Sequence, residues 1–223
     1  MKFDVVIANP PFSLKDWGHE IAESDQYDRF HAGIPPKTKG DWAFISHMIS
    51  TADEKGRVGV VVPHGVLFRG AQEGKIRQHY IEENILAGVI GLPSNLFYGA
   101  GIPAALLIFD KSREPKGKDD IFFIDASNEF EKGSNQNRLR TEDIDKIVNT
   151  YHDKKVIEKY SYIASFDEIE ENEFNLNIPR YVDTFEPEPQ IDIEEVQGDI
   201  ARINKELAEV ESKLEGYLKE LDY

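Results

Sequence analysis

Short runs of apolar residues alternate with more polar segments through the first part of the chain. Five of these runs predict buried strands, over residues 3–8, 58–62, 87–92, 104–109 and 121–124. The segments 41–55 and 72–83 predict helices, the first of them from apolar side chains at helical spacing. Helices that alternate with strands are typical of a parallel α/β sheet with right-handed crossovers. The last strands follow one another too closely for a helical crossover, so we expect them to be antiparallel.

The segments between these elements are polar. We expect Asp41 to be the N-cap of the first long helix, which should end near Gly56. Residues 13–40 predict a long loop with at most a short helix, and a loop of that length is often functional. The rest of the body divides into a polar connector, a short helix and an irregular stretch packed on the sheet, over residues 127–140, 142–151 and 166–183.

The C-terminal segment has an unbroken heptad pattern. Its apolar positions alternate at spacings of three and four residues: Ile193, Val196, Ile200, Ile203, Leu207, Val210, Leu214, Tyr217 and Leu221. A surface helix folded back on the body is one interpretation. The narrow apolar seam, which follows a stiff Pro-containing linker at 185–189, favours a coiled-coil arm that docks on a partner.

Composition narrows the class of protein. A chain of 223 residues can bury one good core and an appendage. No apolar stretch approaches the length of a membrane span and no signal peptide precedes the first strand, so we expect a cytoplasmic protein. The absence of cysteine excludes disulfides and thiolate metal sites. The six histidines show no spacing suited to zinc, so we expect no metal.

The net charge of −16 at first argues against nucleic-acid binding, because phosphates attract Lys and Arg. The charge is unevenly distributed. Residues 165–223 hold 18 acidic and 5 basic side chains, a net of −13, whereas residues 1–164 hold 24 acidic and 21 basic, a net of −3. The first part is therefore nearly neutral, and its basic residues can still cluster against a polyanion.

The most informative short segment is Asn9-Pro10-Pro11-Phe12, which ends the first predicted strand. Each proline fixes its own φ, so covalent geometry aims the backbone carbonyls here. Asn9 adds an amide oxygen as acceptor, and Phe12 adds a flat apolar face. Two aimed acceptors beside an aromatic ring suit a planar heterocycle with an exocyclic NH2 group. The alternative is a strand ended by prolines, with Asn9 as a turn former.

Residues 3–12 (FDVVIANPPF) resemble the catalytic motif of amino-methyltransferases that modify adenine N6 in DNA. The resemblance continues through GDWAFI at 40–45, VPHGVLFRG at 62–70, IGLPSNLF at 90–97, IDAS at 124–127 and NLNIPRYVD at 175–183. In this order the segments resemble the modification (M) subunit of type I restriction-modification systems. The implied fold is a partial Rossmann-like class I methyltransferase sheet, mixed parallel and antiparallel, with a C-terminal coiled-coil helix.

The resemblance implies a role for each residue of the motif. The Asn9 side chain and the Pro10 carbonyl would accept hydrogen bonds from the amino group of an adenine flipped out of the duplex, on which Phe12 would stack. Pro11 completes the catalytic set, and Asn9 and Pro10 would also contact the methyl donor, S-adenosylmethionine. Phe97 follows the third strand and could border the target base, although a core aromatic is an equal alternative.

Three basic residues beyond the second strand are candidates for phosphate contacts, Arg69, Lys75 and Arg77, with ordinary surface charge as the alternative. His64 is interpreted as structural. Gly65 and Gly70 have the gap of a phosphate-binding P-loop, but the required Lys-Ser/Thr pair is absent after them.

The implied partners are DNA, a specificity subunit bound through residues 190–223, and a restriction subunit in the full complex. Two other functions stay open. Asn-Pro-Pro-aromatic motifs also serve enzymes that methylate protein glutamine, and the chain could be a non-catalytic scaffold that binds a specificity subunit.

The family's cofactor-binding Gly-rich turn and acidic residue precede the Asn-Pro-Pro-Phe strand, and only two residues precede that strand here. We therefore expect the chain to correspond to the C-terminal half of a subunit and to be incomplete for catalysis alone. Its expected parts are a half methyltransferase domain at 1–126, a connector at 127–189 and a helix at 190–223. The strand 3–8 should then be an unpaired edge that pairs with itself or with a supplied N-terminal piece.

Overall fold

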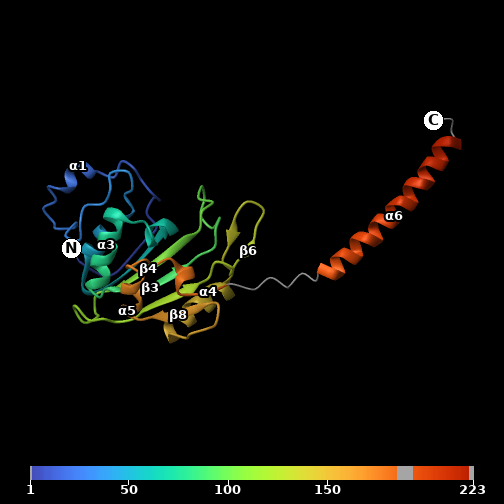
Figure 1. The fold of residues 1–223 in the computed structure, drawn as a ribbon. Helices are drawn as coiled ribbons and strands as arrows, with labels where there is room; N and C mark the ends of the chain where they lie inside the picture. The colour runs from blue at the N-terminus through green and yellow to red at the C-terminus, as the bar shows by residue number, and fades with distance from the viewer. Residues whose placement is uncertain (1, 185–192, 221–223) are drawn as a thin grey trace. The chain divides into compact units, whose positions relative to one another are not determined.

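The computed structural model describes residues 2–184 and 193–220. The chain divides into two units, residues 1–184 and 185–223. The first unit is an α/β body built on one large sheet, and the described part of the second is a single long helix, drawn in orange and red in Figure 1.

A six-stranded mixed sheet runs through the first unit in the order β1-β2-β4-β3-β5-β8. Its strands are β1 (Phe3–Ala8), β2 (Ala52–Pro63), β3 (Leu86–Gly91), β4 (Ala104–Asp110), β5 (Ile121–Asp125) and β8 (Ser161–Ala164). Parallel pairs are β1 with β2 and β3 with β5. Strand β4 is antiparallel to both β2 and β3, and β8 is antiparallel to β5. The predicted mixed α/β sheet is confirmed.

The helices of the body are α1 (His19–Ala22), α2 (Asp41–Thr51), α3 (Ala71–Glu82), α4 (Thr141–Asp153) and α5 (Phe166–Glu171), with 3-10 turns η1 (His64–Leu67) and η2 (Ile178–Arg180). The long loop predicted before α2 is present and contains only the four-residue α1. The predicted polar connector contains a small hairpin, β6 (Glu131–Lys132) paired with β7 (Asn137–Arg138).

Helix α2 begins and ends differently from the prediction. Its N-cap is Gly40, and Asp41 is its first residue, because the Asp41 carboxylate is held by other partners. The helix ends at Thr51, and β2 starts at Ala52. Gly56 is therefore not a helix cap but part of β2. A Cβ on Gly56 would lie 2.8 Å from the carbonyl oxygen of Phe3, so glycine is what allows β1 to approach here.

The prediction of an irregular stretch over residues 166–183 is wrong in its first part. Ser165 caps α5 by accepting a hydrogen bond at its side chain from the Glu168 amide, 3.2 Å away. The preceding strand β8 was also missed, because four residues are too few to show a clear alternation. Both elements close the far end of the sheet beyond β5.

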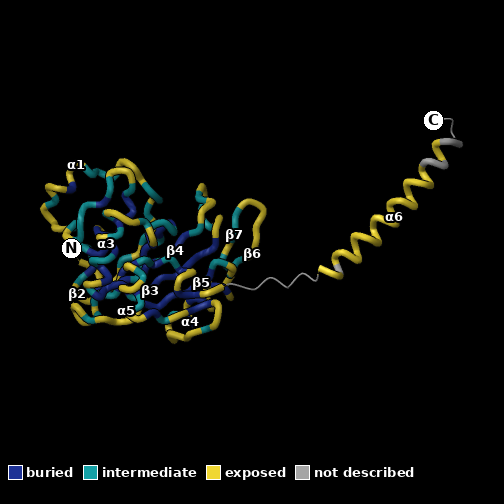
Figure 2. The backbone as a smooth tube through the Cα atoms, viewed as in Figure 1, coloured by how far each residue is buried: buried dark blue, intermediate teal, exposed yellow. Residues whose placement is uncertain are grey.

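Two apolar clusters cover the two faces of the sheet. The larger lies between the sheet and helices α2 and α3 and includes Trp42, Ile76, Val60 and Leu107. The smaller includes Ile90, Phe122 and Ile124 of the sheet and Ile147 of α4. Because side chains alternate along a strand, neighbouring residues such as Phe122 and Phe123 belong to different clusters. Figure 2 shows the central strands as the most deeply buried part of the body.

Strand β1 is an edge strand with an exposed apolar side. Val5 is 64% exposed and Ile7 is 81% exposed, on the face opposite to α2 and α3. Together with Gly59 and Val61 of β2 and Leu106 of β4, they line a shallow groove of about 520 Å³. Among residues 2–184 and 193–220, no strand pairs with the outer side of β1. Strand β1 is therefore the edge strand that the sequence predicted.

The second unit contains α6 (Ile193–Glu220), so the predicted C-terminal helix is present. Its heptad positions from Ile193 to Tyr217 are exposed. The predicted linker at 185–189 and the last heptad position, Leu221, lie outside the described residues. In the described ranges, no helix combines the length and the apolar character that crossing a membrane requires.

Candidate functional site

Four strands of the sheet, β1, β2, β3 and β5, run in one direction, so their carboxyl ends meet at a single sheet edge. Asn9 follows β1, His64 follows β2, and the segment Leu92–Phe97 follows β3. In open α/β sheets this edge is where ligands bind. The topology therefore gathers the predicted motif and the loop that carries Phe97 on the same side of the molecule.

The Asn9–Phe12 motif leaves the sheet directly after Ala8, which is paired with Val60 of β2. Asn9 and Pro11 are exposed, whereas Pro10 and Phe12 are half-buried. In the described part of the chain, no hydrogen bond engages the Asn9 side-chain amide or the Pro10 carbonyl. The two acceptors are thus free for an external donor, as the covalent geometry of the prolines predicts.

Phe97 lies beside Phe12, as an edge-to-face pair with ring centroids 6.1 Å apart and an interplanar angle of 78°. Both rings are half-buried. A turn fixes Phe97, because its carbonyl accepts a hydrogen bond from the Ala100 amide at 3.1 Å. Two rings on separate loops therefore lie side by side, one of them within the motif, and such rings are suited to holding a flat apolar surface.

A buried ionic network anchors the chain immediately after the motif. The Ser13 amide donates to Asp41 Oδ1 at 2.7 Å, and the Ser13 hydroxyl donates to Asp41 Oδ2 at 3.3 Å. The Arg69 guanidinium donates to Asp41 and to Glu73, with Nε 2.7 Å from Glu73 Oε2. Asp41 is only 3% exposed, so its charge requires this compensation. The network joins the motif to α2 and α3.

The same contacts set the ionisation of Arg69. Burial by itself lowers the pKa of Arg69, but the hydrogen bonds and charges of Glu73 and Asp41 outweigh burial, so its pKa is raised. The guanidinium is permanently charged and already bound by two carboxylates. This placement gives Arg69 an internal role and does not support the predicted phosphate contact.

Arg77 is 3% exposed and donates three hydrogen bonds to backbone carbonyls. Its Nε donates to Phe174, and its Nη1 donates to Val66 and to Arg69, over 2.7, 3.2 and 2.9 Å. Burial lowers the pKa of Arg77 to about 10. The residue holds η1 against the segment that follows α5, so its position does not support a phosphate contact either. Lys75 is exposed, and its predicted contact with a phosphate stays a prediction.

His64 stands at the same sheet edge, directly after the proline that ends β2. Its Nε2 atom is buried and has no hydrogen-bond partner among the described residues. Burial lowers the pKa of His64, and the charge of Asp125 opposes that shift only in part. Burial therefore disfavours the charged form of the ring, and its Nε2 atom has no partner among the described residues. The interpretation of His64 as structural stays a prediction.

One group of side chains that the sequence did not associate lies away from this edge. His31, His79 and Glu83 bring one ligand atom each within 4.8 Å of one another. The expectation that no histidines were suited to a metal was based on spacing along the chain. Spacing along the chain could not reveal this group, because His31 comes from the loop before α2 and packs against the end of α3.

Comparisons with known proteins agree on a family. The family described as N-6 DNA Methylase matches residues 1–190. The Type I restriction enzyme MjaVII methylase subunit of Methanocaldococcus jannaschii is 36% identical, over 97% of this chain and 39% of that subunit. The MpnII methylase subunit of Mycoplasma pneumoniae is 32% identical, over 98% of this chain and 40% of that subunit.

The solved structures show the same relationship. A crystal structure of the type I restriction-modification methyltransferase subunit from Streptococcus thermophilus is similar to this chain, with a TM-score of 0.77 and 45% identity. The similarity covers 82% of this chain and 39% of that subunit. The chain thus spans about two fifths of the length of the proteins that it matches.

Proposed function

The chain belongs to the N-6 DNA methylase family, and from that premise we propose that it supplies the target-base half of an adenine-N6 DNA methyltransferase. The full protein would be the modification subunit of a type I restriction-modification complex. One observation supports this proposal above the others. Asn9 and Pro10, whose acceptors are free, belong to the same motif as Phe12, and the Phe12 ring pairs with Phe97 at the sheet edge where ligands bind.

The acceptors match the chemistry of the adenine amino group. This nitrogen is a poor nucleophile, because its lone pair is delocalised into the ring. If the Asn9 side-chain oxygen and the Pro10 carbonyl each accept one N–H, a pyramidal nitrogen with a localised lone pair is favoured. The prolines fix the direction of the Pro10 carbonyl before the base arrives, so little reorganisation of this acceptor is needed when the reaction occurs. Asn9 and Pro10 thus activate the amino group by orientation.

The aromatic pair provides the position of the base. A base inside a duplex is out of reach, so the target must be extruded, and a stacked aromatic face offsets part of the cost of unstacking. Phe12 would stack on the base, and Phe97 would close its edge. Position is the main contribution to catalysis, since the methylated nitrogen can lose its proton to water afterwards.

S-adenosylmethionine would supply the methyl group when bound. The residues present fit only part of its site. Asn9 offers a free acceptor, and it borders the open groove on β1 and β2. We propose that the remaining three fifths of the full subunit provide the other contacts to the donor. The chain alone would then hold and orient the target amino group without completing the transfer.

The seam of α6 supports a second role in assembly. Its apolar heptad side chains, among them Ile200, Leu207 and Leu214, are exposed over the length of the helix. A seam of this width is suited to packing against one or two other helices. We propose that α6 docks on helices of a specificity subunit, in a complex that also holds a restriction subunit. Sequence recognition in DNA would then come from the partner.

A hybrid subunit tests the proposal. It joins this chain to the part of the Streptococcus thermophilus subunit outside the match, and it is assembled with the specificity subunit of that system. The assay follows tritium transfer from S-adenosylmethionine to duplex DNA that contains the recognised adenine. We expect transfer by the unmodified hybrid, loss in Asn9→Ala, and reduced transfer in Phe12→Ala and Phe97→Ala. Tyr98→Ala is the matched control, because Tyr98 is 95% exposed in the same loop.

Other outcomes would contradict the proposal and favour a named alternative. Transfer to a glutamine-containing peptide rather than to DNA would make the chain a protein methyltransferase. Assembly with the specificity subunit without transfer, in a hybrid that binds the methyl donor, would make it a scaffold. Full activity in Asn9→Ala would remove the motif from the mechanism.

A further inference from the structure

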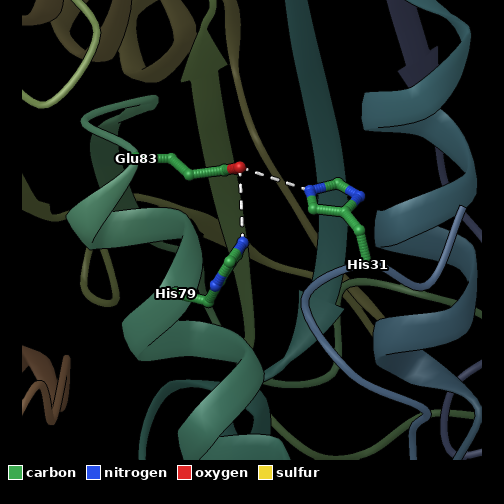
Figure 3. A group of neighbouring side chains, drawn as sticks. All are labelled: His31, His79 and Glu83. Carbon is green, nitrogen blue, oxygen red and sulfur yellow. Dashed lines mark ion pairs between the residues drawn. The ribbon is translucent and has the colours of Figure 1, made fainter. Parts of the chain in front are cut away.

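His31, His79 and Glu83 form a compact group on the surface of the body, shown in Figure 3. His79 belongs to α3, and Glu83 follows the last turn of that helix at a spacing of four residues. His31 reaches them from the loop between α1 and α2. The side chains converge, with Glu83 Oε1 lying 3.3 Å from His31 Nε2 and 3.3 Å from His79 Nε2.

One ring nitrogen of His31 is held by the backbone, and the other faces Glu83. His31 Nδ1 is 3.2 Å from the backbone carbonyl of Asp28, which can only accept, so Nδ1 donates this hydrogen bond. Nε2 lies 3.3 Å from the Glu83 carboxylate and is the nitrogen that an ion would take as its ligand. A histidine that donates its other N–H to a backbone carbonyl is the usual arrangement of a metal ligand.

His79 also turns its Nε2 atom toward Glu83. Its Nε2 atom is buried and, within the described ranges, has no hydrogen-bond partner, although it lies close to the Glu83 oxygen. The two atoms are therefore as close as hydrogen-bonded atoms, but their relative direction does not allow a hydrogen bond. An unsatisfied buried nitrogen that points at a carboxylate and a second imidazole is explained if all three atoms face one ion.

Both rings are held in place before any ion arrives. They lie edge-on to Tyr80, with centroid distances of 5.7 Å from His31 and 5.9 Å from His79. Tyr80 is itself buried, and its hydroxyl donates to Ser46 Oγ at 2.9 Å. The two imidazoles are 5.4 Å apart between centroids. Ligands fixed by packing in this way lose little freedom on binding.

From these contacts we propose that His31, His79 and Glu83 bind a divalent transition-metal ion, with Zn²⁺ as the best match. Two imidazoles and one carboxylate are among the ligand sets of zinc, and such a site leaves a position for water. Tetrahedral zinc with bonds of about 2.0–2.1 Å separates its ligand atoms by about 3.3 Å. The two contacts to Glu83 already have that separation, and the two imidazoles would move together on binding until their nitrogens reach it.

The ion has access from solvent, and its neighbours moderate its affinity. His31 and Glu83 line an open pocket of about 570 Å³. Four basic residues line the same pocket and disfavour a cation, whereas Asp28 and Glu54 offset part of their charge; the basic residues are Lys2, Lys111, Arg113 and Lys116. We therefore expect micromolar affinity rather than the tighter binding of enclosed structural zinc sites.

A bound ion would join the loop that follows the Asn9–Phe12 motif to the end of α3. The ionic network of Ser13, Asp41 and Arg69 already fixes the beginning of that loop against the start of α3. The metal would fix the loop near its other end. In this proposal the ion has a structural role, because it links the loop to α3, and it takes no part in methyl transfer.

Metal titration of the full 1–223 chain, prepared without a histidine tag and treated with chelator, tests the site. Co²⁺ is followed by its visible d–d absorption and Zn²⁺ by calorimetry. We expect saturable binding of one equivalent, with an affinity more than about tenfold lower in His31→Ala, His79→Ala and Glu83→Gln. His152→Ala is the matched control, because His152 is an exposed histidine whose Nδ1 lies 2.8 Å from the carboxylate of Asp153.

Hydrogen exchange provides a second measurement. Zn²⁺ should slow amide exchange in residues 25–33 of the unmodified chain and leave it unchanged in Glu83→Gln. Absence of saturable binding would overturn the proposal. So would unchanged affinity in His31→Ala, or an equal loss in His152→Ala, since either result means adventitious binding to surface histidines only.

Discussion

Removing the charge of Arg69 should destabilise the chain strongly. In Arg69→Met, the carboxylates of Asp41 and Glu73 stay in place, and they are only 3% and 4% exposed. Their hydrogen bonds with the guanidinium are lost, and the aliphatic part of the side chain is kept. A buried charge left without its partner costs about 3–5 kcal/mol. We expect the free energy of unfolding to fall by about that amount.

Two further variants test whether the loss has this cause. In Arg69→Met/Asp41→Asn/Glu73→Gln the buried charges are gone as well, so most of the stability should return. Asp41→Asn alone should cost less, about 1–3 kcal/mol, because an amide oxygen can still accept from the Ser13 amide. Urea unfolding followed by circular dichroism gives all three values. A loss below about 1 kcal/mol in Arg69→Met, or no recovery in the triple variant, would refute the reasoning.

Four more predictions follow from other contacts. Burial lowers the pKa of His64 below its usual 6.5, so the unfolded chain takes up a proton more readily, and stability should fall as pH drops below about 6.5. His64→Gln should flatten this slope in unfolding curves between pH 7 and 5, and an unchanged slope would contradict the assignment. The chain should self-associate through the exposed edge of β1, and Ile7→Lys should make it monomeric in light scattering at high concentration. A strictly monomeric unmodified chain would contradict this prediction. The chain alone should show no binding of S-adenosylmethionine, and micromolar binding in calorimetry would be evidence against an incomplete site. Leu207→Glu should abolish binding of a specificity subunit in pull-down, whereas Lys205→Glu, a change outside the apolar seam, should not.

Periodicity located five strands of the sheet, because each carries apolar residues within a short run, although β2 begins six residues before the predicted 58–62. Residues 3–8 match β1 in both bounds, and residues 104–109 fall one residue short of the end of β4. The order in which the strands lie next to one another was harder to predict from the sequence. Strand β5 bypasses β4 and pairs parallel with β3, which no local pattern encodes. The strand Ser161–Ala164 was too short to detect.

The residues of the candidate site also differ in how far the sequence could predict them. The acceptors of Asn9 and Pro10 follow from covalent geometry, so the sequence could indicate them directly. Phe97 was a candidate to border the target base only through the resemblance, and the structure places its ring beside Phe12. The role of Arg77 could not be assigned from sequence, because the sequence does not distinguish an exposed arginine from a buried one that bonds to backbone carbonyls. Burial and three carbonyl acceptors decide between them.

The proposed metal site illustrates the limit of reasoning from spacing. His79 and Glu83 are four residues apart and could have been associated on a helix surface. His31 lies far earlier, and only tertiary packing against Tyr80 brings it close. Ligands from separate elements leave no signal in a single sequence unless the fold is already known.

The central claim is that Asn9 to Phe12 orients the adenine amino group. Its most direct test is the single-turnover rate of methyl transfer by the hybrid subunit at saturating S-adenosylmethionine and DNA. Loss of one preorganised polar contact in the transition state costs about 10²–10³-fold. We predict a decrease of that size in Asn9→Ala, with Tyr98→Ala unchanged. A rate in Asn9→Ala within about threefold of the unmodified hybrid would contradict the claim.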